Sequence, residues 1–192
     1  MKKQFILIFF ILSLFIVSCT SVLKLVYGVK KPKPRSIEYL KRQARKYSIN
    51  QLPIYTISQE DLMPLFKKMQ KLGIGTSVNN VIIFDKKGSL IIPNFNKTCS
   101  SQSAVFFSNY MDNGKIVDSV HFEDLFGISL KHLENNVAYE PDSNKTIFVI
   151  TWASYAGRLN KYNSSFWADS IIEIMNSNEQ EAIYLDLDLV EN

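Results

Sequence analysis

Some apolar residues of the chain form continuous β-branched runs, and others recur at helical spacing. Helical spacing predicts one helix from Ser36 to about Tyr47, with Ser36 as its N-cap, and a second from the cap Ser58 to the stop Gly73. Apolar runs predict strands at 52–57, 80–85, 89–92, 146–151 and 182–187. Further helices are predicted at 100–111, 121–133 and 159–175, and the polar stretch 135–144 is predicted to be a loop.

Two local arrangements of these elements indicate the fold class. The runs 80–85 and 89–92 are joined by Lys86-Lys87-Gly88, which predicts a β-hairpin. The C-terminal segment has the strand, helix, strand order of a parallel βαβ unit. We therefore expect an α/β fold with a mixed β-sheet flanked by helices.

The first 18 residues have the features of a signal peptide. Lys2 and Lys3 precede an apolar run from Phe5 to Val17, which Ser13 alone interrupts. At about 1.5 Å per residue, this run is too short to cross a hydrocarbon core of about 30 Å. The run ends in Ile16-Val17-Ser18-Cys19, which resembles a bacterial lipobox.

The lipobox resemblance implies a bacterial lipoprotein. In that family the cysteine thiol, here that of Cys19, receives a diacylglyceryl group, and the chain is cut just before it. Thr20, rather than aspartate, follows Cys19, which favours the outer membrane of the cell envelope, facing the periplasm or the cell surface. The alternative is an uncleaved membrane anchor that extends to Leu23. Under either interpretation the remaining chain lies at a membrane face.

Charge divides the chain after the signal peptide. Lys24 to Lys46 holds nine basic residues and one acidic residue, a net charge of +8, whereas 47–192 carries −6. The proline-rich segment Lys31 to Arg35 predicts an extended spacer. We expect a lipidated basic linker at 19–35 and one domain at 36–192. The basic stretch either contacts anionic lipid head groups or forms a solvated linker and helix face. Nucleic acid is disfavoured as a partner because this stretch would lie outside the cytoplasm.

A fifteen-residue segment, Ile147 to Lys161, resembles the first strand and active-site turn of thioredoxin-like proteins. Trp152 and Gly157 match the family pattern, whereas Ala156 and Leu159 occupy its two catalytic cysteine positions. The strand at 182–188 and the hairpin at 80–92 resemble two further parts of that fold. The hairpin precedes the turn, the reverse of the family order, and no proline stands just before Val81. The resemblance therefore implies either a permuted thioredoxin-like domain or convergence on βαβ patterning. The chain also resembles uncharacterised lipoproteins of Bacteroidetes, which imply no activity.

The number of free thiols in the sequence excludes a dithiol oxidoreductase. Disulfide exchange needs an attacking and a resolving thiol, and Cys99 is the only thiol that remains once Cys19 is acylated. Cys99 is interpreted either as a redox thiol at a predicted helix start or as a small core residue. Asp186 and Asp188 are predicted to share a strand face, either for acid–base work or as structural acids. A ligand groove beside Trp152 is a further hypothesis.

These observations predict a membrane-anchored envelope protein whose redox-inactive domain has a binding or scaffolding role. No catalytic residue, metal or cofactor is expected. The expected partners are the membrane, through the anchor and linker, and an unidentified envelope protein or small ligand. The alternative is a monothiol redox protein or sensor that acts through Cys99, and a third hypothesis is a sugar- or peptide-binding lipoprotein.

Overall fold

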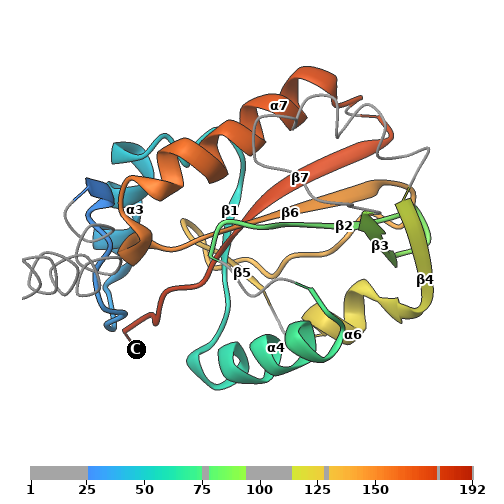
Figure 1. Cartoon of the computed structure of the whole chain (residues 1–192), viewed down its shortest axis with the longest axis horizontal. Coiled ribbons are helices and arrows are strands. Elements are labelled where there is room, and N and C mark those ends of the chain that lie inside the picture. Colours follow the sequence, from blue (N-terminus) through green and yellow to red (C-terminus); the bar gives the residue numbers. More distant parts are fainter. Residues whose placement is uncertain (1–25, 75–77, 94–113, 128–129, 177, 192) are drawn as a thin grey trace, which may run out of the picture.

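The structure, a computed structural model, describes residues 26–74, 78–93, 114–127, 130–176 and 178–191 (Figure 1). The helices are α3 (Ile37–Lys46), α4 (Gln59–Lys71), α6 (Phe122–Phe126) and α7 (Phe166–Ile174), and α7 follows a π-helical segment, η3 (Asn160–Ser165). The strands are β1 (Ile54–Thr56), β2 (Val81–Phe84), β3 (Ser89–Pro93), β4 (Gly114–His121), β5 (Lys131–His132), β6 (Thr146–Trp152) and β7 (Gln180–Asp186).

The seven strands form one mixed sheet in the order β4-β3-β2-β6-β7-β1-β5. Strands β6, β7 and β1 run parallel to one another, while the hairpin β2-β3 lies antiparallel beside β6. The edge strands β4 and β5 are also antiparallel to their neighbours. The expected α/β fold with a mixed sheet flanked by helices is therefore confirmed.

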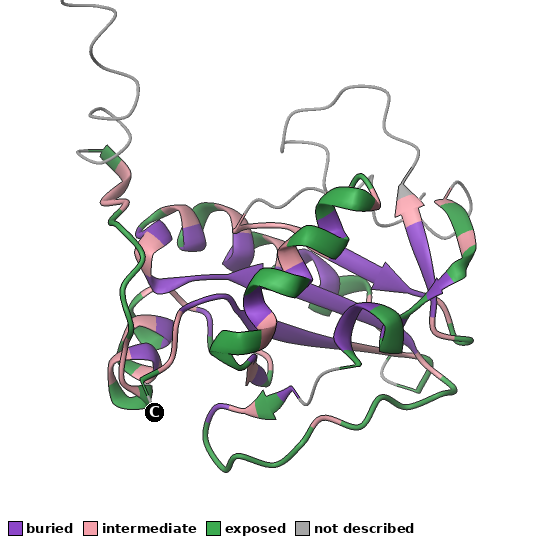
Figure 2. Ribbon diagram, turned by 90° about the horizontal axis from the view of Figure 1, so that it is seen from below, coloured by how far each residue is buried: buried purple, intermediate pink, exposed green. Residues whose placement is uncertain are grey.

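Each face of the sheet has its own hydrophobic core, because successive side chains of a strand point to opposite faces. Ile147 and Val149 of β6 pack on the face that α4 and α6 cover. Phe148, Ile150 and Trp152 of the same strand pack on the face that α3 and α7 cover. Figure 1 shows the sheet between these two pairs of helices. Figure 2 shows that the central strands are buried, whereas the outer sides of the helices are exposed.

The N-caps of the first two predicted helices are where the sequence places them. The Ser36 hydroxyl accepts a hydrogen bond from the backbone N–H of Tyr39 at the start of α3. At the start of α4 the Ser58 hydroxyl accepts from the N–H of Asp61 and donates to the Asp61 carboxylate, over 3.2 and 2.6 Å. These reciprocal bonds satisfy donors that the first helical turn leaves free. The predicted hairpin, βαβ unit and polar loop are also present.

The helix predicted at 121–133 is wrong beyond its first turns. Helix α6 ends at Phe126, and Lys131–His132 forms the edge strand β5 against β1. A Cβ on Gly127 would lie 2.1 Å from the carbonyl oxygen of Glu123, so the chain turns at a position that a side chain would obstruct. The apolar residues that follow Gly127 are divided between the hydrophobic cores on the two faces of the sheet. Their spacing in the sequence alone does not distinguish this arrangement from a helix.

Strand β4 was not predicted because its sequence lacks an apolar alternation. Most of its residues are exposed or half-buried, and Val120 is the one that is buried. The predicted helix at 159–175 is present as a continuous helical segment, although Asn160–Ser165, η3, is π-helical. Within the described ranges, no helix is both long and apolar enough to cross a membrane.

Candidate functional site

The parallel strands β6, β7 and β1 end at one edge of the sheet. Asp186 of β7 pairs with Trp152 of β6 on one side and with Thr56 of β1 on the other. From this edge the chain passes from β6 to α7 on one face and from β1 to α4 on the opposite face (Figure 1). Such a divergence at the carboxyl ends of parallel strands is a common position for functional sites.

The three segments that carry the thioredoxin-like resemblance are neighbours in the sheet. The turn from Trp152 to Leu159 follows β6, β7 is its parallel neighbour, and the hairpin β2-β3 flanks β6 on the other side. Among the described residues there is no cis peptide bond. The sequence resemblance therefore corresponds to one contiguous part of the sheet.

Gly157 shapes the turn after β6. A single 3-10 turn, η2 (Ser154–Ala156), leads to Gly157, which has φ +61° and ψ −132°, a conformation that other residues rarely adopt. A Cβ at this position would lie 2.3 Å from the carbonyl oxygen of Tyr27 and 2.6 Å from that of Gly28. Glycine is thus required both by the backbone conformation and by the close approach of the N-terminal segment.

Residues 27–30 cover this turn through backbone hydrogen bonds. The N–H of Lys30 donates to the carbonyl of Tyr155, and the N–H of Arg158 donates to the carbonyl of Tyr27, each over 2.7 Å. The Tyr27 ring also contacts that of Tyr162 edge-on. The basic segment predicted as a linker therefore packs against the domain before α3 begins.

The turn holds no group that could exchange disulfides. Ala156 is buried and Leu159 half-buried, and neither side chain carries a thiol. Asn160 braces the turn by donating from its side-chain amide to the carbonyl of Ala153 over 2.8 Å. Trp152 is completely buried in the core beneath α3 and α7, which favours its interpretation as a core residue.

Asp186 and Asp188 form a buried pair beneath the turn. Both are almost fully inaccessible to solvent. The carboxylate of Asp188 accepts hydrogen bonds from the backbone N–H of Ser154 and, over 2.7 Å, from its hydroxyl. The N–H of Asp188 donates to Asp186 Oδ1 over 3.1 Å. Asp188 therefore joins the end of β7 to the turn after β6, which favours a structural role for it.

Burial raises the pKa of Asp186 well above its usual value, and the neighbouring charge of Asp188 raises it further. Its Oδ2 has no hydrogen-bond partner among the described residues. Burial, with smaller contributions from Asp188 and Asp186, also raises the pKa of Tyr155 to about 12. The site beneath the turn is thus a closed environment that favours a protonated Asp186.

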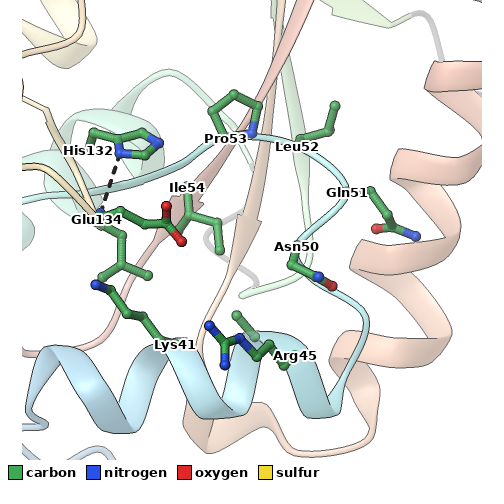
Figure 3. Close-up of a pocket in the computed structure, with 11 residues that line it drawn as sticks. Lys41, Arg45, Asn50, Gln51, Leu52, Pro53, Ile54, His132 and Glu134 are labelled. Atoms are coloured by element: carbon green, nitrogen blue, oxygen red, sulfur yellow. Dashed lines mark hydrogen bonds between the residues drawn. The ribbon is translucent and has the colours of Figure 1, made fainter.

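An open pocket of about 310 Å³ lies elsewhere, between α3 and the β1-β5 edge of the sheet (Figure 3). Its buried lining residues are Ala44 of α3, Ile54 of β1 and Leu133. The other lining residues come from α3, from the segment before β1 and from the end of β5: Lys41, Arg45, Asn50, Gln51, Leu52, Pro53, His132 and Glu134. The pocket thus combines a small apolar lining with charged and amide side chains.

The wall of the pocket is held by polar contacts. The Gln51 amide donates to Asp169 Oδ1 over 2.7 Å, and its carbonyl oxygen accepts from the hydroxyl of Tyr184 over 2.9 Å, so Gln51 is tied to both α7 and β7. On the opposite side, the backbone N–H of Glu134 donates to Nδ1 of His132 over 3.3 Å (Figure 3).

Sequence reasoning grouped Trp152, Ala156, Gly157 and Leu159, and the structure keeps them together in one turn with Asp186 and Asp188 beneath it. Cys19, Cys99 and the predicted helix 100–111 lie outside the described residues, so lipidation and thiol chemistry stay predictions. In the described part of the chain, no three His, Cys, Asp or Glu side chains form a group that could hold a metal ion.

The pocket was missed by sequence reasoning. Its one signal was the basic stretch at 24–46, which contributes Lys41 and Arg45 at helical spacing. The segments around residues 50–54 and 132–134 have no motif that would join them to that helix.

No protein-family model matches the chain, and neither the curated proteins nor the solved structures contain a match to it.

Proposed function

We propose that this chain is a lipid-anchored envelope protein whose α/β domain binds a ligand or partner and does not exchange disulfides. One observation carries the binding role: the open pocket beside α3 is lined by charged and amide side chains, while the turn after β6 is closed by residues 27–30. The residues that line the pocket are therefore suited to binding a ligand, whereas the closed turn is suited to a structural role.

A permuted thioredoxin-like domain is part of this proposal. Its support is the adjacency of the turn, the parallel strand β7 and the antiparallel hairpin β2-β3 in one sheet. Ala156 and Leu159 at the cysteine positions make such a domain redox-inactive.

The membrane anchor rests on the lipobox at Cys19 and on the basic segment that follows it. Lys30, Lys31 and Lys33 are exposed on the segment that leads into the domain, where anionic head groups would attract them at about 1 kcal/mol per charge. Several acyl chains together hold a protein firmly at a bilayer, whereas one holds it weakly.

Metabolic labelling with an alkyne fatty acid tests the anchor. We expect label on the wild-type chain and on the Cys99→Ser variant, and none on Cys19→Ala. Label retained in Cys19→Ala would contradict the proposal, as would a wild-type chain that is unlabelled and keeps residues 1–18 by mass spectrometry.

An insulin-reduction assay tests the absence of disulfide exchange. With dithiothreitol as the reductant, we expect the purified full chain to leave the rate unchanged. Acceleration by the wild type that disappears in Cys99→Ser would replace the binding role with the monothiol alternative.

A further inference from the structure

The pocket beside α3 carries opposite charges on opposite walls. Lys41 and Arg45 project from α3 on one side, and Glu134 follows β5 on the other (Figure 3). Within the described ranges, ion pairs at N···O distances of 4.0 Å or less join Lys86 to Glu179 and Lys145 to Asp142, and neither involves these three side chains. The pocket therefore presents two cations and one anion that are free to pair with a ligand.

The remaining lining residues define the rest of the ligand. Ala44, Ile54 and Leu133 are buried apolar residues that offer contact for a few methylene groups. Asn50 adds an exposed amide. Because Gln51 is held by Asp169 and Tyr184, the wall that bears Asn50 is held to the domain before a ligand arrives. A volume of about 310 Å³ is small for a ligand pocket and fits a small molecule or a single head group.

We propose that this pocket binds a small zwitterion, with its phosphate or carboxylate group at Lys41 and Arg45 and its ammonium group at Glu134. Charge-assisted hydrogen bonds form on both sides, and the short apolar spacer between the two groups lies against Ala44, Ile54 and Leu133. This inference deepens the proposed binding role and does not depend on the lipid anchor. Two sources share the chemistry: a free zwitterionic metabolite, and the head group of phosphatidylethanolamine.

Helix α3 supplies a matched control for the cationic wall. Arg42 and Lys46 lie on the same helix, are exposed and do not line the pocket. The double variant Arg42→Gln/Lys46→Gln therefore removes the same charge as Lys41→Gln/Arg45→Gln while leaving the pocket intact. If general electrostatic attraction caused the binding, affinity would fall equally in both double variants. If the ligand occupies the pocket, affinity falls only in Lys41→Gln/Arg45→Gln.

Soluble probes test the zwitterion directly. The full chain, in a neutral maltoside detergent, is titrated with O-phosphoethanolamine and γ-aminobutyrate and with their analogues that lack nitrogen, ethyl phosphate and butyrate. Binding is followed by backbone amide NMR signals. For the wild type, we expect saturable binding and a dissociation constant about threefold or more lower for at least one zwitterion than for its analogue.

The variants separate the two walls. Glu134→Gln should remove the advantage of the zwitterion over its analogue. Lys41→Gln/Arg45→Gln should weaken every probe about tenfold, and Arg42→Gln/Lys46→Gln should stay within about twofold of the wild type. The proposal is overturned if no probe saturates, if neither zwitterion exceeds its analogue, or if both double variants weaken binding equally. Such a failure leaves the anchor and a scaffolding role intact, which the fatty-acid label tests separately.

A second arm identifies the source of the ligand. The chain is placed in phosphatidylglycerol nanodiscs with and without phosphatidylethanolamine. Shifts of the amide signals of Asn50 and Glu134 that require phosphatidylethanolamine and vanish in Glu134→Gln support the head group. Unmoved signals in the discs, with the soluble zwitterion still bound, support a free ligand.

Discussion

Replacing Gly157 by alanine tests whether residues 27–30 are locked onto the turn. The new Cβ would lie 2.3 Å from the carbonyl oxygen of Tyr27 and 2.6 Å from that of Gly28, and both atoms are backbone atoms that cannot rotate away. Residues 27–30, the covering segment, must therefore move, or the turn must change its conformation. Gly73 is a matched control, since it also has a positive φ, +69°, but nothing lies within 4 Å of a Cβ there.

The structure gives the size of the effect. A non-glycine residue in the conformation of Gly157 costs about 1–3 kcal/mol. Moving the segment also breaks the hydrogen bonds from Lys30 to Tyr155 and from Arg158 to Tyr27, each worth about 1 kcal/mol. We expect the free energy of unfolding to fall by about 3–5 kcal/mol in Gly157→Ala. In Gly73→Ala the expected loss is the conformational cost alone, about 1–2 kcal/mol.

Two measurements on the full chain check this result. Urea unfolding followed by circular dichroism compares the two alanine variants with the wild type. Limited trypsin digestion reports on the covering segment, because the backbone at Lys30 must leave its hydrogen bond to Tyr155 before trypsin can cut the Lys30-Lys31 bond. Lys31 and Lys33 each precede a proline and are not cut. Faster cleavage after Lys30 is expected in Gly157→Ala alone. Equal destabilisation by both variants, with unchanged cleavage in each, would refute the idea that the segment is locked onto the turn.

Three further predictions concern buried polar groups near the sheet edge. Because the pKa of Asp186 is raised, the native state holds a proton that the unfolded state releases, so this group makes stability fall as pH rises above about 4. Asp186→Asn should therefore make the slope of unfolding free energy against pH less negative, by up to about 1.4 kcal/mol per pH unit. Urea titrations from pH 4 to 8 measure this slope, and a slope identical to that of the wild type would contradict the prediction. Ser154→Ala removes one hydrogen bond to buried Asp188 and should cost about 1–3 kcal/mol in urea unfolding, whereas Ser170→Ala, which loses only a bond to its own helix, should cost far less. Tyr184→Phe removes the hydroxyl that donates to the pocket-wall amide and should cost about 1 kcal/mol; a loss below about 0.3 kcal/mol would show that this bond does not stabilise the wall.

The elements that sequence predicts well are those whose own residues decide their structure. Helices α3 and α4 begin at serine caps that bond to the first turn, and the apolar run of β6 is buried along its whole length. The hairpin β2-β3 turns through Gly88, which has φ +76°. In each case the pattern that makes the prediction is also the physical reason that the element forms.

The elements that sequence misses depend on partners far away in the chain. Strand β4 is polar, and its place at the sheet edge comes from pairing with β3. The short strand β5 exists because His132 pairs with Tyr55, more than seventy residues earlier. The pocket has the same origin, since His132 and Glu134 reach α3 only through that pairing. A local periodicity carries no information about such long-range contacts.

The covering segment also limits where the pocket can lie if Cys19 is acylated. Because the carbonyl of Tyr27 is fixed to Arg158, only eight peptide steps separate the acylated residue from the domain, and a chain of that length spans at most about 30 Å. A bilayer is therefore within reach of the part of the domain to which this segment leads, helix α3, with Lys41 and Arg45 on its pocket side and Arg42 and Lys46 outside it. Loosening the segment by Gly157→Ala would lengthen the tether by several residues. Under a head-group source for the ligand, that variant should weaken the response to phosphatidylethanolamine in nanodiscs while leaving the affinity for soluble O-phosphoethanolamine unchanged. Equal loss in both assays would instead mean that the turn supports the pocket itself, because the soluble probe does not depend on the tether.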